Sequence, residues 1–99
     1  MMRTKQQQKN RSSIGIIGDI LDAAAYQGRS GVNISAVSRK ANLSHYIAIE
    51  KCDNLVRAGL IESKRTPRNV IFTITDKGIQ FFQELKRFKH IMEQANLKY

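Results

Sequence analysis

Residues 34–75 read ISAVSRKANLSHYIAIEKCDNLVRAGLIESKRTPRNVIFTIT, and this segment carries most of the structural information in the chain. Its first part, Ile34 to Ala41, has apolar residues at helical spacing and meets the polar break Asn42-Leu43-Ser44. A longer helical segment follows, for which Ser44 is a good N-cap and Gly59 supplies the left-handed residue that ends it. The segment therefore predicts a short helix, a tight turn and a second helix.

Two short β-like runs come next, at Leu60–Lys64 and Val70–Thr75. They are separated by the basic loop Arg65-Thr66-Pro67-Arg68-Asn69. Apolar side chains alternate along the second run, which is typical of a strand with one buried face. A helix, a turn, a helix and a hairpin with a basic tip form the outline of a winged helix-turn-helix. We therefore expect an α+β fold that is mostly α.

The segments on the N-terminal side complete this outline. Ser12 or Ser13 can cap a first helix, Val32 can add a short strand, and Asn33 or Ser35 can start the next helix. The expected inward positions of the first helix are Ile14, Ile17, Ile20, Leu21, Ala24 and Ala25. Those of the helix after Ser44 are Ala48, Ile49, Cys52, Leu55 and Val56.

The last helix is expected to begin at Asp76, capped at Thr75-Asp76, and to run to near Tyr99, about 36 Å at the usual rise per residue. That is longer than a domain of this size covers on one side. Its apolar residues follow a heptad seam, which predicts a dimerisation surface. The seam consists of Phe81, Leu85, Phe88, Met92, Ala95 and Tyr99. The alternative is that these side chains only cover the chain's own domain. We accordingly divide the chain into an N-terminal arm (1–11), a winged helix-turn-helix domain (12–75) and a coiled-coil dimerisation helix (76–99).

Positive charge is concentrated rather than spread evenly. The formal net charge is +9 and the isoelectric point is near 10.1. The cations gather in residues 1–11, which form an expected basic flexible arm, in the loop between the two strands, and at Arg39 and Lys40. Such a distribution favours a polyanionic partner, and double-stranded DNA fits the predicted fold.

The sequence offers no catalytic or metal-binding pattern. The single cysteine, Cys52, excludes an internal disulfide and is expected in the core. His45 and His90 lack neighbouring ligands at metal-binding spacing, and the pair Gly15 and Gly18 lacks the context of a phosphate loop. No apolar run is long enough for a membrane span. We expect a protein that is not an enzyme, binds no cofactor, metal or small-molecule substrate, and is cytoplasmic and nucleoid-associated.

The candidate DNA-binding residues lie on the second motif helix, the loop between the strands and the preceding short helix. They are Ser44, His45, Tyr46, Glu50, Lys51, Asn54, Arg57, Lys64, Arg65, Arg68, Arg39 and Lys40. The first turn of such a helix usually meets base edges or phosphates, while Lys and Arg suit phosphates and Asn suits adenine. The role of Glu50 stays open. An ordinary solvated helix face is the alternative for this set.

Several motifs together resemble one known family. They are Ala41-Asn42-Leu43-Ser44, then Leu55, Ala58-Gly59-Leu60-Ile61, and Ile74-Thr75-Asp76-Lys77-Gly78. Over residues 12–99 the chain resembles the archaeal winged-helix proteins of the ten-kilodalton chromatin-associated type. This resemblance implies a homodimer joined by an antiparallel coiled coil of the last helices, with double-stranded DNA as the ligand.

The sequence therefore favours a homodimeric double-stranded DNA-binding protein, either a transcriptional regulator or a chromatin-associated protein. Its recognition helix would lie in the major groove, and its basic wing would lie on the backbone or in the minor groove. Two other functions remain open: a winged-helix protein–protein interaction module in a larger assembly, and an RNA-binding winged helix.

Overall fold

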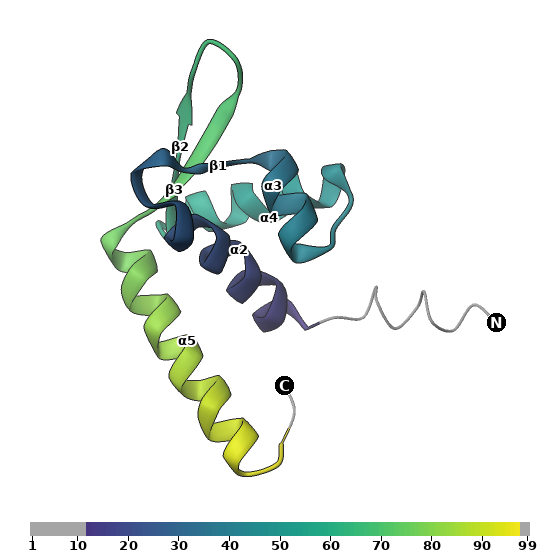
Figure 1. The fold of residues 1–99 in the computed structure, drawn as a ribbon, viewed down its shortest axis with the longest axis vertical. Coiled ribbons are helices and arrows are strands. Elements are labelled where there is room, and N and C mark those ends of the chain that lie inside the picture. The colour runs from purple at the N-terminus through teal and green to yellow at the C-terminus, as the bar shows by residue number, and fades with distance from the viewer. Residues whose placement is uncertain (1–11, 98–99) are drawn as a thin grey trace, which may run out of the picture.

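The computed structural model describes residues 12–97, which fold around one apolar core (Figure 1). The helices are α2 (Ser13–Gln27), α3 (Ile34–Ala41), α4 (His45–Arg57) and α5 (Asp76–Gln94), with a short 3-10 turn at Gly28–Ser30. The strands are β1 (Val32–Asn33), β2 (Ile61–Arg65) and β3 (Val70–Ile74). The predicted order of helix, turn, helix and hairpin is confirmed, as is the mostly helical α+β fold class.

Side-chain caps begin each of the α-helices, at positions that the sequence indicated. The hydroxyl of Ser12 accepts from the amide of Gly15 at 3.0 Å, and the side chain of Asn33 accepts from the amide of Ala36 at 2.9 Å. Ser44 caps α4, and Thr75 caps α5. These bonds satisfy amide groups that have no partner within the helix.

The core lies where α2, α3 and α4 meet the sheet. Its fully buried side chains come from each of these helices and from β2. The largest of them are Ile20, Leu21, Ile61, Val37 and Cys52. No polar or charged residue among residues 12–97 is buried with them. The removal of apolar surface from water therefore stabilises this domain, because it is the main favourable contribution to folding.

The three strands form an antiparallel sheet in the order β1-β3-β2. Val32 lies opposite Phe72, and the β2–β3 hairpin pairs from Ile61↔Ile74 to Arg65↔Val70. Phe72 is buried, which confirms the predicted inward face of the second run. The hairpin extends away from the helices at one end of the molecule, and α5 extends from the other end (Figure 1).

The start of α5 is fixed against the link between α4 and β2. The hydroxyl of Thr75 donates to the carbonyl of Gly59 at 2.7 Å, and the Lys77 amine donates to the carbonyl of Ala58 at 2.9 Å. A Cβ added at Gly78 would overlap the carbonyl oxygen of Leu60. Only glycine allows this close approach, so the local sequence sets where α5 leaves the domain.

Two predicted inward positions are wrong. Ile49 is 41% exposed and Ile14 is 38% exposed, whereas Ile16 is buried. Consecutive residues differ by about 100° around a helix, so Ile49 lies at the edge of the narrow stripe that Ala48 occupies. Ile14 instead faces the space between α2 and α5.

The predicted length of the last helix is also wrong. α5 ends at Gln94, and Ala95 lies beyond its last turn. Asn96 takes a left-handed conformation (φ 65°), while the amide of Leu97 bonds back to the carbonyl of Met92 at 2.8 Å. This pattern is a Schellman-type stop with asparagine in the position that glycine usually takes. Tyr99 and the arm of residues 1–11 lie outside the described residues.

Candidate nucleic-acid interface

The exposed face of α4 carries a stripe of side chains at spacings of four, three and four residues. These side chains are Tyr46, Glu50, Asp53 and Arg57, and all of them are exposed. Tyr46 is 77% exposed, which is unusual for a tyrosine because this residue is commonly at least partly buried. Because these spacings bring residues to the same side of a helix, the four groups present one continuous surface.

The first turn of α4 is exposed as well. The hydroxyl of Ser44 accepts from the amide of Ile47 at 3.2 Å, so it is used as the cap, and His45 stands beside it in solvent. Lys51 differs from the other predicted contacts because it is half-buried on the flank of the helix. The structure therefore brings most of the predicted α4 residues together but places Lys51 at the margin.

At the other end of the stripe, Arg57 is held by Asn54. The Arg57 Nη2 donates to Asn54 Oδ1 at 2.6 Å. A guanidinium carries five N–H donors in a planar fork, so donors remain for a phosphate. The pair thus presents an oriented cation at the last turn of α4.

The tip of the β2–β3 hairpin is stiffened by one hydroxyl. Thr66 Oγ1 accepts from the amides of Asn69 at 3.0 Å and Arg68 at 3.2 Å, and donates to the Asn69 carbonyl at 2.8 Å. The backbone amide of Thr66 also donates to that carbonyl, at 2.7 Å. Lys64, Arg65 and Arg68 are all exposed around this closed turn. The hairpin therefore presents three cations on a locally ordered loop.

The end of α3 contributes less charge than the sequence suggested. Lys40 Nζ lies 2.8 Å from the Asp22 carboxylate on α2. The hydrogen bond and charge of Asp22 raise the pKa of Lys40 above its ordinary value. Arg39, by contrast, is exposed. Lys40 is thus already paired within the protein, and Arg39 is the more available of the two predicted contacts.

These features match known proteins in both sequence and structure. A family model described as winged helix-turn-helix matches residues 10–93. The chain belongs to the winged helix-turn-helix family. A search of curated protein sequences found no match.

Solved winged helix-turn-helix structures from several organisms share the fold. Sso10a-2, a DNA-binding protein from Sulfolobus solfataricus, superposes with a TM-score of 0.75 at 25% identity, over 87% of this chain and 86% of that one. The PcaV transcriptional regulator from Streptomyces coelicolor gives 0.73 at 20% identity, over 94% and 74% of the two chains. A MepR–DNA complex from Staphylococcus aureus gives 0.68 at 18% identity, over 94% and 76%. The last two likenesses concern the fold alone.

Within the winged helix-turn-helix, α3 and α4 form the two helices of the motif and the β2–β3 hairpin forms the wing. The turn between the helices is closed by the amide of Leu43, which donates to the Ser38 carbonyl at 2.9 Å, and by left-handed Asn42. The sequence reasoning missed Asp53 and the exposure of Ile49. Spacing alone would have found Asp53, because it lies seven residues after Tyr46 on the exposed face.

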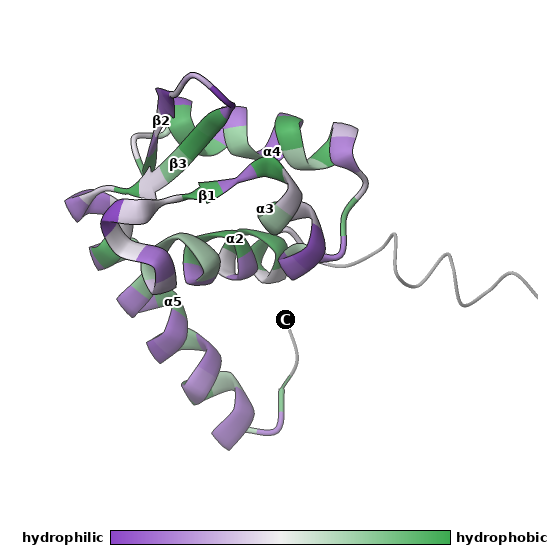
Figure 2. Ribbon diagram, turned by 45° about the horizontal axis from the view of Figure 1, so that its top comes forward, coloured by the Kyte–Doolittle hydropathy of each residue, from purple (hydrophilic) through white to green (hydrophobic). Residues whose placement is uncertain are grey.

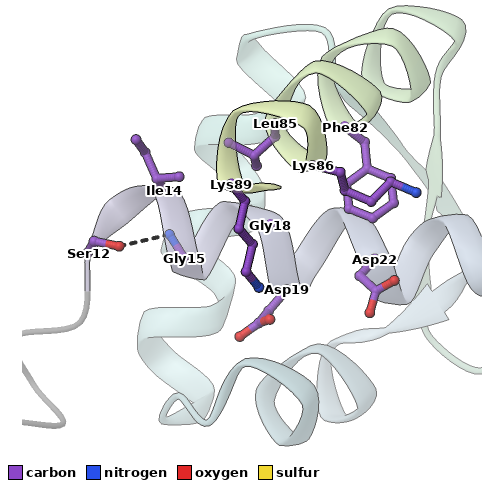
Figure 3. A pocket seen from close by; sticks show the side chains of 10 residues that line it. All are labelled: Ser12, Ile14, Gly15, Gly18, Asp19, Asp22, Phe82, Leu85, Lys86 and Lys89. Atoms are coloured by element: carbon purple, nitrogen blue, oxygen red, sulfur yellow. Dashed lines mark hydrogen bonds between the residues drawn. The ribbon is translucent and has the colours of Figure 1, made fainter. Parts of the chain in front are cut away.

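A groove of about 520 Å³ separates the first turns of α2 from α5 (Figure 3). Ile14, Phe82 and Leu85 give it apolar walls, and the Lys89 side chain points across it toward Asp19. The Lys86 amine lies 4.6 Å from the centre of the Phe82 ring. The small residue Gly18 lets α5 approach, since its added Cβ would be 3.4 Å from Leu85.

No metal or redox site is evident within the part of the chain that the structure describes. Residues 12–97 contain no group of three or more His, Cys, Asp or Glu side chains arranged to hold a metal ion. Cys52 is buried, and burial raises the pKa of its thiol to about 12, with a smaller effect from Asp53. The thiol is therefore protonated and packs as a small apolar group. No helix in this range is both long and apolar enough to cross a membrane.

Proposed function

We propose that this chain is a homodimeric double-stranded DNA-binding protein that acts as a transcriptional regulator or chromatin-associated protein. In this proposal α4 enters the major groove and the wing contacts the backbone or the minor groove. The observation that carries it is the pairing of an exposed helix face with a stiff, basic wing in one winged helix-turn-helix domain. Helix-turn-helix proteins read DNA with the second helix of the motif.

The likeness to Sso10a-2 supports this function, since that protein is described as DNA-binding and matches nearly the whole chain. The archaeal ten-kilodalton chromatin type is the subfamily that we propose on this basis, with a nucleoid-associated location in the cytoplasm. The basic arm of residues 1–11 would add phosphate contacts.

Dimerisation is proposed to use α5 beyond the point where it leaves the domain. Phe81 is 42% exposed and Phe88 is 43% exposed, and they lie on one face with the half-buried Leu85 and Met92. Purple predominates over most of α5 in Figure 2, so these apolar groups form an isolated stripe on a hydrophilic helix. A second copy of α5 would bury the stripe, as in a short coiled coil. Phe82, in contrast, packs onto the chain's own core.

The test is binding to a mixed-sequence duplex across a salt series. If a dimer neutralises about six to eight phosphates, log K falls with log salt with a slope of about −5 to −7. Changing Lys64, Arg65 and Arg68 together to alanine is expected to reduce that slope by about two or three. A wild-type slope shallower than about −2 contradicts the mechanism. Arg87→Ala on α5, an exposed cation away from the wing, is the control and is expected to leave the slope unchanged.

A protein–protein interaction module is the second candidate, because Tyr46 and Ile49 place apolar surface on the exposed side of α4. In that case the purified dimer fails to bind duplex even at low salt. Competition between duplex DNA and structured RNA separates the third candidate, an RNA-binding winged helix, from the first.

A further inference from the structure

The centre of the exposed α4 face is acidic, although the chain as a whole carries a formal charge of +9. Glu50 and Asp53 stand on adjacent turns between Tyr46 and Arg57, and both are exposed. Within residues 12–97 neither carboxylate has an ion pair or side-chain hydrogen bond (the nearest stripe cation, Arg57, is bonded to Asn54). The stripe therefore presents two carboxylates against one guanidinium.

An acidic stripe is unsuited to a helix that binds DNA through general charge attraction. The major groove is about 12 Å wide and has phosphates along both edges, so a carboxylate at the centre of the helix is repelled from either side. Carboxylates accept hydrogen bonds and donate none. In the major groove a carboxylate is matched best by the amino group of cytosine, and unmatched sequences are left with the repulsion alone.

Glu50 is the better placed of the two acids. It lies in the second turn of α4, near the N-terminal end that approaches base edges in helix-turn-helix complexes. Its side chain is one methylene longer than that of Asp53, which lies one turn farther along. Arg57, held by Asn54 at the far end, is positioned for a phosphate instead.

Resting on the proposed function, we propose that Glu50, assisted by Asp53, is a specificity-determining residue. It accepts from a cytosine amino group in the major groove and weakens binding to duplexes that lack this group at the matching position. The wing and Arg39 supply attraction to phosphates, and the acidic stripe restricts where that attraction is used. This division favours a site-selective regulator over a protein that coats DNA regardless of sequence.

The experiment selects bound sequences from a randomised duplex pool with the wild type, Glu50→Gln and Glu93→Gln. Glu93 is an exposed acid near the end of α5, so its change alters the net charge equally but away from α4. Glutamine pairs with adenine, so the base enriched at one position is expected to change from cytosine in the wild type to adenine in Glu50→Gln. Glu93→Gln is expected to keep the cytosine.

A second measurement uses a duplex made only of A·T pairs, at low salt. Glu50→Gln is expected to bind it at least about fivefold more tightly than Glu93→Gln does, the lower end of what one base-pair contact contributes. Identical selected sequences and equal affinities for the two variants overturn the inference alone. Failure of the wild type to bind any duplex overturns the proposed function and the inference together. Thermal melting verifies that both variants are folded.

Discussion

The wing and α5 extend from opposite ends of the same core, but they are held in different ways (Figure 1). The wing tip is ordered from within, by the hydroxyl of Thr66 and its bonds to Arg68 and Asn69. α5 is anchored at its base, where Gly78 meets the backbone of Leu60, and farther along its apolar stripe is uncovered. Local hydrogen bonds thus prepare the wing for a ligand, while α5 depends on a junction and, in our proposal, on a second chain.

The largest expected effect breaks the junction. In Gly78→Ala the new methyl group would overlap the Leu60 carbonyl oxygen, so the backbone has to move. We expect a loss of about 3 kcal/mol or more in the free energy of unfolding, measured by urea denaturation.

Gly18→Ala is the matched control for this change. Its new methyl group would be 3.4 Å from Leu85, an ordinary contact, and alanine is favoured over glycine inside a helix. Its stability is expected to equal or exceed that of the wild type. Equal loss of stability in both variants would show that the close approach at Gly78 is not what holds α5.

The next largest effect tests the uncovered part of α5. Phe88→Ala removes an aromatic group that is 43% exposed in the single chain and central to the proposed seam. We expect the dissociation constant of the dimer to rise about tenfold or more, as for a buried aromatic anchor, with little change in helix content. Sedimentation equilibrium measures this constant. Gln83→Ala, an exposed position off the seam, is the control.

The sequence predicted features that rest on local signals. Ser44, Gly59 and Phe72 reveal a cap, a left-handed stop and an inward strand position through their own residue types and immediate neighbours. The end of α5 was missed because the heptad pattern was given more weight than Asn96, whose left-handed conformation is an equally local stop.

Features that depend on distant partners could not be predicted in this way. Nothing near Lys40 in the sequence indicates that Asp22 on α2 will pair with it. Asp53 was overlooked for a different reason. Basic and amide groups are the usual contacts to DNA, and the acidic character of the α4 face emerged only from the positions that the fold leaves exposed.

A smaller effect is expected at the wing. Thr66→Val keeps the shape of the side chain but removes the hydroxyl that closes the turn. We expect duplex affinity to fall about fivefold, the equivalent of one hydrogen bond of about 1 kcal/mol, because Arg68 is no longer held in place. Thr66→Ser is expected to restore the affinity. If Thr66→Val binds as the wild type does while Arg68→Ala binds weakly, the wing acts through charge without prior ordering.

The smallest effect concerns the pair of Lys40 and Asp22, which links α2 to α3 on the surface. Asp22 raises the pKa of Lys40 in the folded protein above its ordinary value of 10.5. The stabilising contribution of a cation with a raised pKa is complete below the unfolded pKa and is lost as pH rises through the folded pKa. We therefore expect Asp22→Asn to lower the melting temperature slightly at neutral pH, with a difference from the wild type that shrinks above pH 10.5 as Lys40 loses its proton. The same variant frees Lys40, so duplex binding at neutral pH should strengthen slightly. A difference in melting temperature that persists unchanged at high pH would mean that Asp22 stabilises the helices by another contact, and Lys40 would then be available to DNA in the wild type.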